Sequence, residues 1–232
     1  MINVRKSGER RHIANENQAT WMTFDRENKA DTLRGGFGSL KIFNEQILPP
    51  GSVFTLETHQ DMVVVTYVQE GVIIYNGPLG KTGLVEPGDF LQINAAPDSK
   101  QYALNASPVD EAHVFQSGFT PNVGLLEPGG RKKLFTLAER KGVLKLIASP
   151  DGKEASLKIQ QDVQMYSTLI HKGNHMIHEI KPGRKAWLHL VTGRIFMNGL
   201  HLQAGDGAGF SGEKCVSFTA QEPSEILLFD LA

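Results

Sequence analysis

Short runs of apolar residues, separated by glycine and proline, repeat along the whole chain. Examples are "SLKIFNEQIL" (39–48), "MVVVTYVQEG" (62–71) and "EILLFDLA" (225–232). Several runs alternate apolar and polar residues, which is typical of strands with one buried face. Helical periodicity is weak, and only "RKKLFTLAERKG" (131–142) predicts a short helix, between two β halves. The pattern predicts an all-β protein.

One arrangement of these runs occurs twice. In "YVQEGVIIYNGPLGKTGLVEPGDF" (67–90) a strand is followed by a glycine, a second strand, a turn and then "PGD". In "HLVTGRIFMNGLHLQAGDGAGF" (189–210) the same order ends in "AGD". Glycine permits the corner of a hairpin, and a Gly-Asp turn reverses the chain before the next strand. The repetition predicts an internal duplication, with one domain at 1–130 and a second at 131–232.

Composition narrows the functional classes. The net charge of −1 provides no basic face for nucleic acid. The single cysteine, Cys215, excludes an intramolecular disulfide, fits a reducing compartment and is expected to be a buried structural thiol. No stretch approaches the roughly 20 apolar residues of a membrane helix. The segment "MINVRKSGERRHI" has no apolar core of a secretion signal, so we expect a cytoplasmic protein.

Several stretches together resemble one known family. The order of "EG" and "PGD" is similar to the cupin barrel, a jelly-roll or double-stranded β-helix, and two copies imply a bicupin. More narrowly, "LKIFNEQILPPGSVF" (40–54), "HQDMVVVTYVQEGVIIYNGPLG" (59–80) and "PGDFLQINA" (87–95) resemble the pirin family. The C-terminal part, through "LIASPDGKEASLKIQQDVQMYSTLI" (146–170) and "ILLFDLA" (226–232), resembles the bacterial branch typified by the YhaK protein.

The resemblance implies a metal site whose ligands are replaced in this chain. Metal-binding pirins carry His-Pro-His-x-Asp-Met-Glu and a later His-Ser-Glu. Two histidines of the first motif and the His and Glu of the second bind one divalent metal, commonly iron. Here Glu57 stands for the first His, His59 for the second and Val63 for the Glu of that motif. Gln101 and Ala103 stand for the second-motif His and Glu.

These replacements lead to two interpretations of the site. A non-haem iron site usually has two imidazoles and a carboxylate, whereas this chain retains one imidazole. The first interpretation is a vestigial pocket of Glu57, His59, Val63, Gln101 and Ala103, with no metal and no other cofactor. The alternative is a divalent metal such as iron in the N-terminal barrel, held by Glu57, His59 and Gln101.

Two functional hypotheses follow from the two interpretations. The favoured one is a non-catalytic, pirin-like module that binds an unidentified small molecule or protein partner and has a regulatory role. The alternative is a metal-dependent dioxygenase of the quercetin 2,3-dioxygenase type, an activity that the resemblance implies. A monomer is expected in either case.

The remaining histidines do not predict a metal site. His175 and His178 lie three positions apart, so on a strand their side chains point to opposite faces. His189 and His201 flank the second hairpin, where they have room to approach each other across strands. Satisfied structural imidazoles remain the simpler interpretation for both pairs.

Overall fold

A computed structural model describes residues 1–56, 62–77, 82–94, 101–120 and 129–232, with only the backbone for Thr55, Leu56 and Gln101. Contacts divide these residues into two compact units. The N-terminal unit contains residues 11–135 and 159–161, and the C-terminal unit contains residues 1–10, 136–158 and 162–232. The predicted division at residue 130 stays a prediction; residues 1–10 pack with the C-terminal half of the chain.

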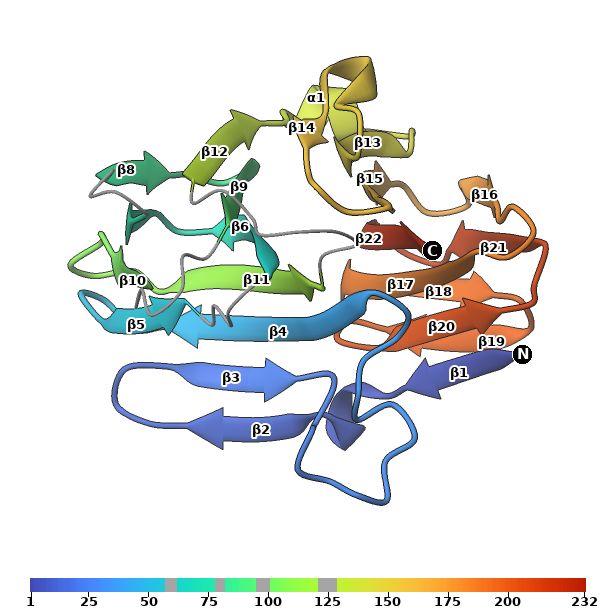
Figure 1. Ribbon diagram of the computed structural model, residues 1–232, viewed down its shortest axis with the longest axis horizontal. Helices are drawn as coiled ribbons and strands as arrows, with labels where there is room; N and C mark the ends of the chain where they lie inside the picture. The colour runs from blue at the N-terminus through green and yellow to red at the C-terminus, as the bar shows by residue number, and fades with distance from the viewer. Residues whose placement is uncertain (57–61, 78–81, 95–100, 121–128) are drawn as a thin grey trace. The chain divides into compact units, whose positions relative to one another are not determined.

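The N-terminal unit consists of two antiparallel sheets (Figure 1). The seven-stranded sheet has the order β12-β9-β6-β11-β4-β3-β2, and the four-stranded sheet has the order β5-β10-β7-β8. Apolar residues of both sheets form one core cluster, which includes Phe54, Val68, Leu91 and Val114. Its strands are β2 (Arg11–Ala14), β3 (Ala19–Met22), β4 (Leu40–Leu48), β5 (Val53–Leu56), β6 (Val63–Glu70), β7 (Ile73–Asn76), β8 (Thr82–Val85), β9 (Asp89–Asn94), β10 (Gln101–Asn105), β11 (Ala112–Phe119) and β12 (Gly129–Leu134).

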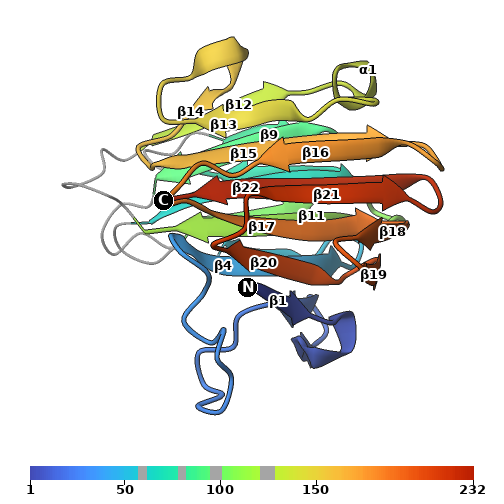
Figure 2. The same ribbon diagram turned by 90° about the vertical axis from the view of Figure 1, so that its right-hand side faces the viewer.

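The C-terminal unit has the same division into a seven-stranded and a four-stranded sheet, ordered β1-β20-β17-β22-β15-β13-β14 and β16-β21-β18-β19. Figure 2 shows β15, β22, β17 and β20 side by side. The predicted short helix is present as the four residues of α1. Its elements are β1 (Ile2–Arg5), the 3₁₀ turns Ser7–Glu9 and Lys153–Ala155, α1 (Leu137–Arg140), β13 (Lys145–Ser149), β14 (Leu157–Lys158), β15 (Val163–Ile170), β16 (His175–Glu179), β17 (Lys185–Thr192), β18 (Arg194–Met197), β19 (Leu200–Gln203), β20 (Gly207–Ser211), β21 (Cys215–Ala220) and β22 (Ser224–Leu231).

The two units share the turn that suggested a duplication. The buried carboxylate of Asp89 accepts a hydrogen bond from the backbone N–H of Glu86 at 2.9 Å, and that of Asp206 accepts one from Gln203 at 3.1 Å. A lysine Nζ lies 2.9 Å from each carboxylate, Lys132 in one unit and Lys6 in the other. Each Gly-Asp turn is therefore closed by the same charge-assisted bonds.

An ion-pair network joins β16 and β22 to the turn that precedes β17 in the C-terminal unit. The Arg184 guanidinium donates to both Asp230 and Asp162, the second at 2.8 Å. The His178 ring Nε2 lies 2.9 Å from the second carboxylate oxygen of Asp230. Burial raises the pKa of Asp230, but the hydrogen bonds from His178 and Arg184 outweigh it, so the net pKa lies below its usual 3.8.

Because the pKa of Asp230 is lowered by folding, its contribution to stability is present above pH 4 and is lost as the pH falls below that value. We expect the free energy of unfolding, measured with urea, to decrease as the pH falls below about 4. In Asp230→Asn part of that decrease is absent, whereas the exposed control Glu222→Gln retains it. An identical pH dependence for Asp230→Asn and the unsubstituted chain would contradict this expectation.

Candidate functional site

Three of the five predicted pocket residues, Glu57, His59 and Gln101, have side chains that lie outside the described part of the structure. Glu57 and His59 lie outside the described residues, and Gln101 is described by its backbone, which starts β10 opposite Leu56 of β5. Val63 starts β6 and is fully buried. Successive side chains of a strand point to opposite faces. The Val63 side chain therefore points to the same face as Val65, and the opposite face is the one turned to the core cluster. The convergence of Glu57, His59 and Gln101 on one pocket stays a prediction.

Ala103, like Val63, is a predicted site residue whose side chain the structure describes. It lies in β10 between Phe54 of β5 and Tyr75 of β7, and it is 1% exposed. Its methyl group belongs to the core cluster between the two sheets of the N-terminal unit. A methyl group at a position where the resemblance implies a carboxylate donates nothing to a metal. Any metal in this unit is therefore bound by donors from other positions.

The interior of the N-terminal unit has a polar part as well as an apolar part. Strands β4, β11 and β6 turn Leu48, Val114 and Val68 toward the core cluster. Gln116 lies two residues from Val114 on β11, and Thr66 lies two residues from Val68 on β6, so both point to the same face as these valines. Both side chains are completely buried. These two residues were not among those predicted from the sequence. The signal for them is a polar residue at a buried-strand position in "AHVFQSGF" and in "VVVTYVQE".

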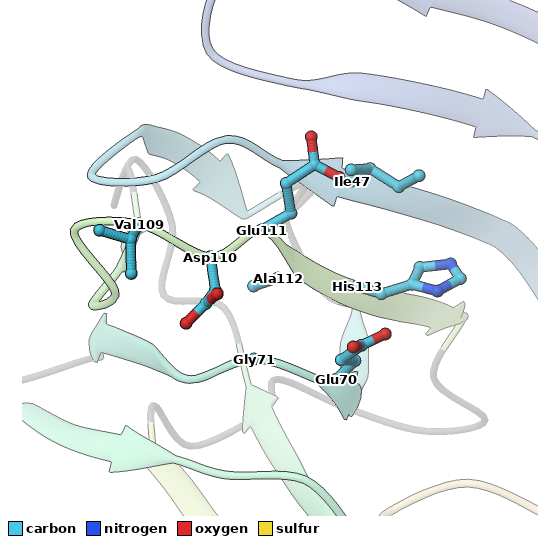
Figure 3. A pocket seen from close by; sticks show the side chains of 8 residues that line it. All are labelled: Ile47, Glu70, Gly71, Val109, Asp110, Glu111, Ala112 and His113. Carbon is cyan, nitrogen blue, oxygen red and sulfur yellow. The ribbon is translucent and has the colours of Figure 1, made fainter.

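A separate cleft of ≈500 Å³ lies at the opposite end of β6 from the first motif (Figure 3). Glu70 and His113 face each other there across β6 and β11, beside Asp110 and Glu111. The His113 ring Nε2 lies 2.9 Å from a carboxylate oxygen of Glu45. Seven residues of strand, roughly 23 Å at the usual rise, separate this cleft from the start of β6. It is not part of the predicted metal site.

The other histidines are placed as structural groups. His175 contacts the Thr219 hydroxyl at 2.9 Å on the exposed side of β16, whereas His178 on the other side contacts Asp230. His189 is buried in β17 of the seven-stranded sheet, and His201 is exposed in β19 of the four-stranded sheet. Among the described residues, no three or more His, Cys, Asp or Glu side chains are grouped to hold a metal ion.

The expected full burial of Cys215 is not found, whereas its structural role stays a prediction. Its thiol is free but partly exposed, at the first position of β21, where a strand end gives less cover than a strand centre.

No helix in the part of the chain that the structure describes is long and apolar enough to cross a membrane.

Comparison with known proteins identifies the family. Residues 146–231 match a family described as the quercetinase C-terminal cupin domain. Over 231 residues, the chain is 30% identical to the quercetin 2,3-dioxygenase of Escherichia coli K12, covering 100% of this chain and 99% of that protein. The chain belongs to the pirin and quercetinase family of cupins. The bicupin fold predicted from the sequence is confirmed by this assignment and by the two twin-sheet units.

A solved structure within the pirin family bears on the metal. The crystal structure of the bacterial pirin YhhW of E. coli in complex with nickel(II) has a TM-score of 0.89 and 29% identity, covering 100% of this chain and 99% of that chain. This overturns our expectation that no metal or cofactor belongs to this pirin-type chain. The expectation equated the loss of imidazoles with the loss of a metal, although divalent ions also accept carboxylate and amide oxygens.

The finer assignment to a YhaK-type branch is not supported. The pirin-like protein YhaK of E. coli K12 is 26% identical over 207 residues, covering 84% of this pirin-type chain and of that protein. The quercetin 2,3-dioxygenase match is higher in identity and covers the whole chain. The stretches at 146–170 and 226–232 overlap the part of the chain, residues 146–231, that matches the quercetinase C-terminal cupin domain.

Proposed function

We propose that this protein is a metal-dependent dioxygenase that acts on a flavonol of the quercetin type in its N-terminal unit. The observation that carries the proposal is the end-to-end match, at 30% identity, to a protein named quercetin 2,3-dioxygenase. The nickel(II) complex of the bacterial pirin YhhW, similar over the full length, supports a divalent metal. We further propose that the protein acts as a monomer in the cytoplasm.

The donors for such a metal are Glu57, His59 and Gln101. A carboxylate, an imidazole and an amide fit a divalent ion that accepts oxygen as well as nitrogen ligands. The buried methyl group of Ala103 excludes that position from the ligand set, which leaves coordination positions for substrate. A metal bound there would supply Lewis-acid activation of the flavonol and of oxygen. The chain itself binds and orients the flavonol and keeps bulk water from the apolar part of the interior.

The proposal is tested by metal content and turnover. Purified protein is stripped with chelator, reloaded separately with nickel, iron, copper or manganese, dialysed and analysed for bound metal. We expect stoichiometric binding of at least one metal and consumption of quercetin, followed by its absorbance. The variant Glu57→Ala/His59→Ala should lose about 100-fold or more in turnover, because second-shell changes alone cost 10–100-fold.

The matched control is His201→Ala, which removes an exposed imidazole from the C-terminal unit and should leave turnover unchanged. Turnover that persists in the Glu57→Ala/His59→Ala variant would refute these ligands. Reloaded protein that retains no metal and consumes no quercetin would refute the proposed function.

A second function is favoured by the position of Ala103. Its methyl group stands among apolar residues where a family ligand is implied, so this position offers contact to a bound molecule and no ligand to a metal. The same N-terminal unit would then serve a small-molecule-binding or protein-interaction module with a regulatory role. Quercetin that binds the metal-loaded protein without being consumed would favour this second function.

A further inference from the structure

Four uncharged polar side chains form a band on the inner face of the seven-stranded sheet in the N-terminal unit. They are Thr20 of β3, Gln46 of β4, Gln116 of β11 and Thr66 of β6, and these four strands are consecutive neighbours. Thr20 pairs directly with Gln46, and Thr66 pairs directly with Gln116. Directly paired residues have Cβ atoms about 4.5–5.5 Å apart. We call this set the polar band.

Strand alternation turns the polar band toward the interior. Gln116 lies two residues from Val114, Thr66 two residues from Val68, and Gln46 two residues from Leu48. These three apolar residues belong to the core cluster between the two sheets. Side chains at positions i and i+2 of a strand point to one face, so the polar band continues that cluster along the same face.

The polar band is buried, and most of its polar side-chain atoms have no hydrogen-bond partner among the residues that the structure describes. Each of its four residues is at most 1% exposed. Among the atoms of the described chain, no hydrogen-bond partner is found for the oxygen or the nitrogen of the Gln116 side-chain amide. The same holds for the hydroxyls of Thr66 and Thr20 and for the side-chain carbonyl oxygen of Gln46. Buried polar groups in native proteins are rarely left unpaired, because each costs the desolvation of its donor or acceptor.

A cleft lies beside the same part of this sheet. It has a volume of ≈220 Å³ and is lined in part by Met22, Ile42 and Asn44. Asn44 is the register partner of Gln116 on β4. Thr20 and Gln46 lie two residues from Met22 and Asn44 on the same strands, so the polar band reaches the strands β3 and β4 that line this cleft.

We propose that the polar band recognises the hydroxyl groups of an uncharged, polyhydroxylated aromatic ligand. The Gln116 amide supplies both a donor and an acceptor, the threonine hydroxyls supply either, and Gln46 supplies an acceptor. The band carries no charge to balance an anion or a cation. Its apolar neighbours Val64, Val68 and Val114 suit the ring faces of such a ligand, as in most small-molecule sites.

This inference rests on the proposed function, because it names groups that would hold the flavonol. Its test is nevertheless a binding measurement on the full chain stripped of metal, which needs no turnover. The probes are quercetin and flavone, which has the same ring system and carbonyl group without the hydroxyls. The variants Gln116→Met and Thr66→Val remove the polar groups and nearly preserve side-chain volume. Gln203→Met and Thr82→Val, at exposed positions, are the matched controls.

We expect the Kd for quercetin to rise at least ten-fold in Gln116→Met and in Thr66→Val, and to stay unchanged in the two controls. The Kd for flavone should change less than two-fold in all four variants. The melting temperature of Gln116→Met should be equal to or above that of the unsubstituted chain, because an unpaired buried amide is removed.

Three results would overturn the inference. The first is an unchanged Kd for quercetin in both band variants. The second is a fall in melting temperature together with equal losses of quercetin and flavone binding, which would assign the polar band to the fold through buried water. The third is an unsubstituted chain that binds no quercetin. Band-dependent binding of quercetin without turnover by the metal-loaded protein would refute the dioxygenase function and leave this inference standing.

Discussion

Substitution of Arg140 by leucine is expected to lower the free energy of unfolding by about 3–5 kcal/mol, because it leaves a buried carboxylate unpaired. Arg140 ends α1 and is 1% exposed. Its guanidinium donates to a carboxylate oxygen of Glu225 at 2.7 Å and to the Ser167 hydroxyl at 3.1 Å. The pair thus fixes α1 on β15 and β22 of the C-terminal unit. Urea denaturation at pH 7 measures the effect.

Two further variants separate the ion pair from the packing around it. The double variant Arg140→Leu/Glu225→Leu should recover most of the lost stability, since replacing both buried charges by apolar groups is often close to neutral. The neighbouring Lys141→Leu changes an exposed residue and should remain within about 0.5 kcal/mol of the unsubstituted chain. A double variant as unstable as Arg140→Leu alone would show that the loss does not come from the unpaired carboxylate.

Gly193→Ala is the second substitution for which we expect a large loss, about 2–5 kcal/mol. Gly193 joins β17 to β18 at φ +88°, which costs a residue with a Cβ about 1–2 kcal/mol. An added Cβ would also lie 2.3 Å from the Ser224 hydroxyl and 2.4 Å from the Pro223 carbonyl oxygen. The backbone carbonyl cannot rotate away, so overpacking adds about 1–3 kcal/mol.

Gly183 provides a matched control for this glycine. Its φ of +84° is nearly the same, but an added Cβ would meet no atom within 4 Å. Gly183→Ala should therefore show only the backbone cost. The difference between the two variants in urea denaturation isolates the steric clash at Gly193, and equal losses in both would show that the clash is relieved by movement.

The arrangement of strands was predictable from local sequence because the turns and the alternation agree. The runs at 39–48, 62–71 and 225–232 are β4, β6 and β22. The two Gly-Asp turns are found at Asp89 and Asp206 with the same bonds, as a duplication predicts.

The polar interior was not predictable in the same way. In β11 every residue but His113 is buried, so both faces of the strand are covered and alternation no longer tells which side is the interior. Gln116 was thus indistinguishable by pattern from a polar residue at a strand edge. The register with Asn44 and Thr66, which assigns its face, arises from pairings of residues far apart in the sequence.

The metal was misjudged for a different reason. Glu57, His59 and Gln101 were compared with a family pattern one position at a time. That comparison shows which donors are lost, but it carries no information about the coordination geometry that the remaining oxygen and nitrogen donors can form.

The pairing of β1 with β20 gives the chain an unusual order of assembly. Ile2 lies opposite Phe210 and Arg5 opposite Gly207, so the first strand of the sequence completes the sheet built by the last third. During synthesis β1 emerges long before its partner and waits as an unpaired edge, with the entire N-terminal unit made in between. Closing so large a loop is entropically costly, so docking of β1 is expected to be among the late and slow events of folding.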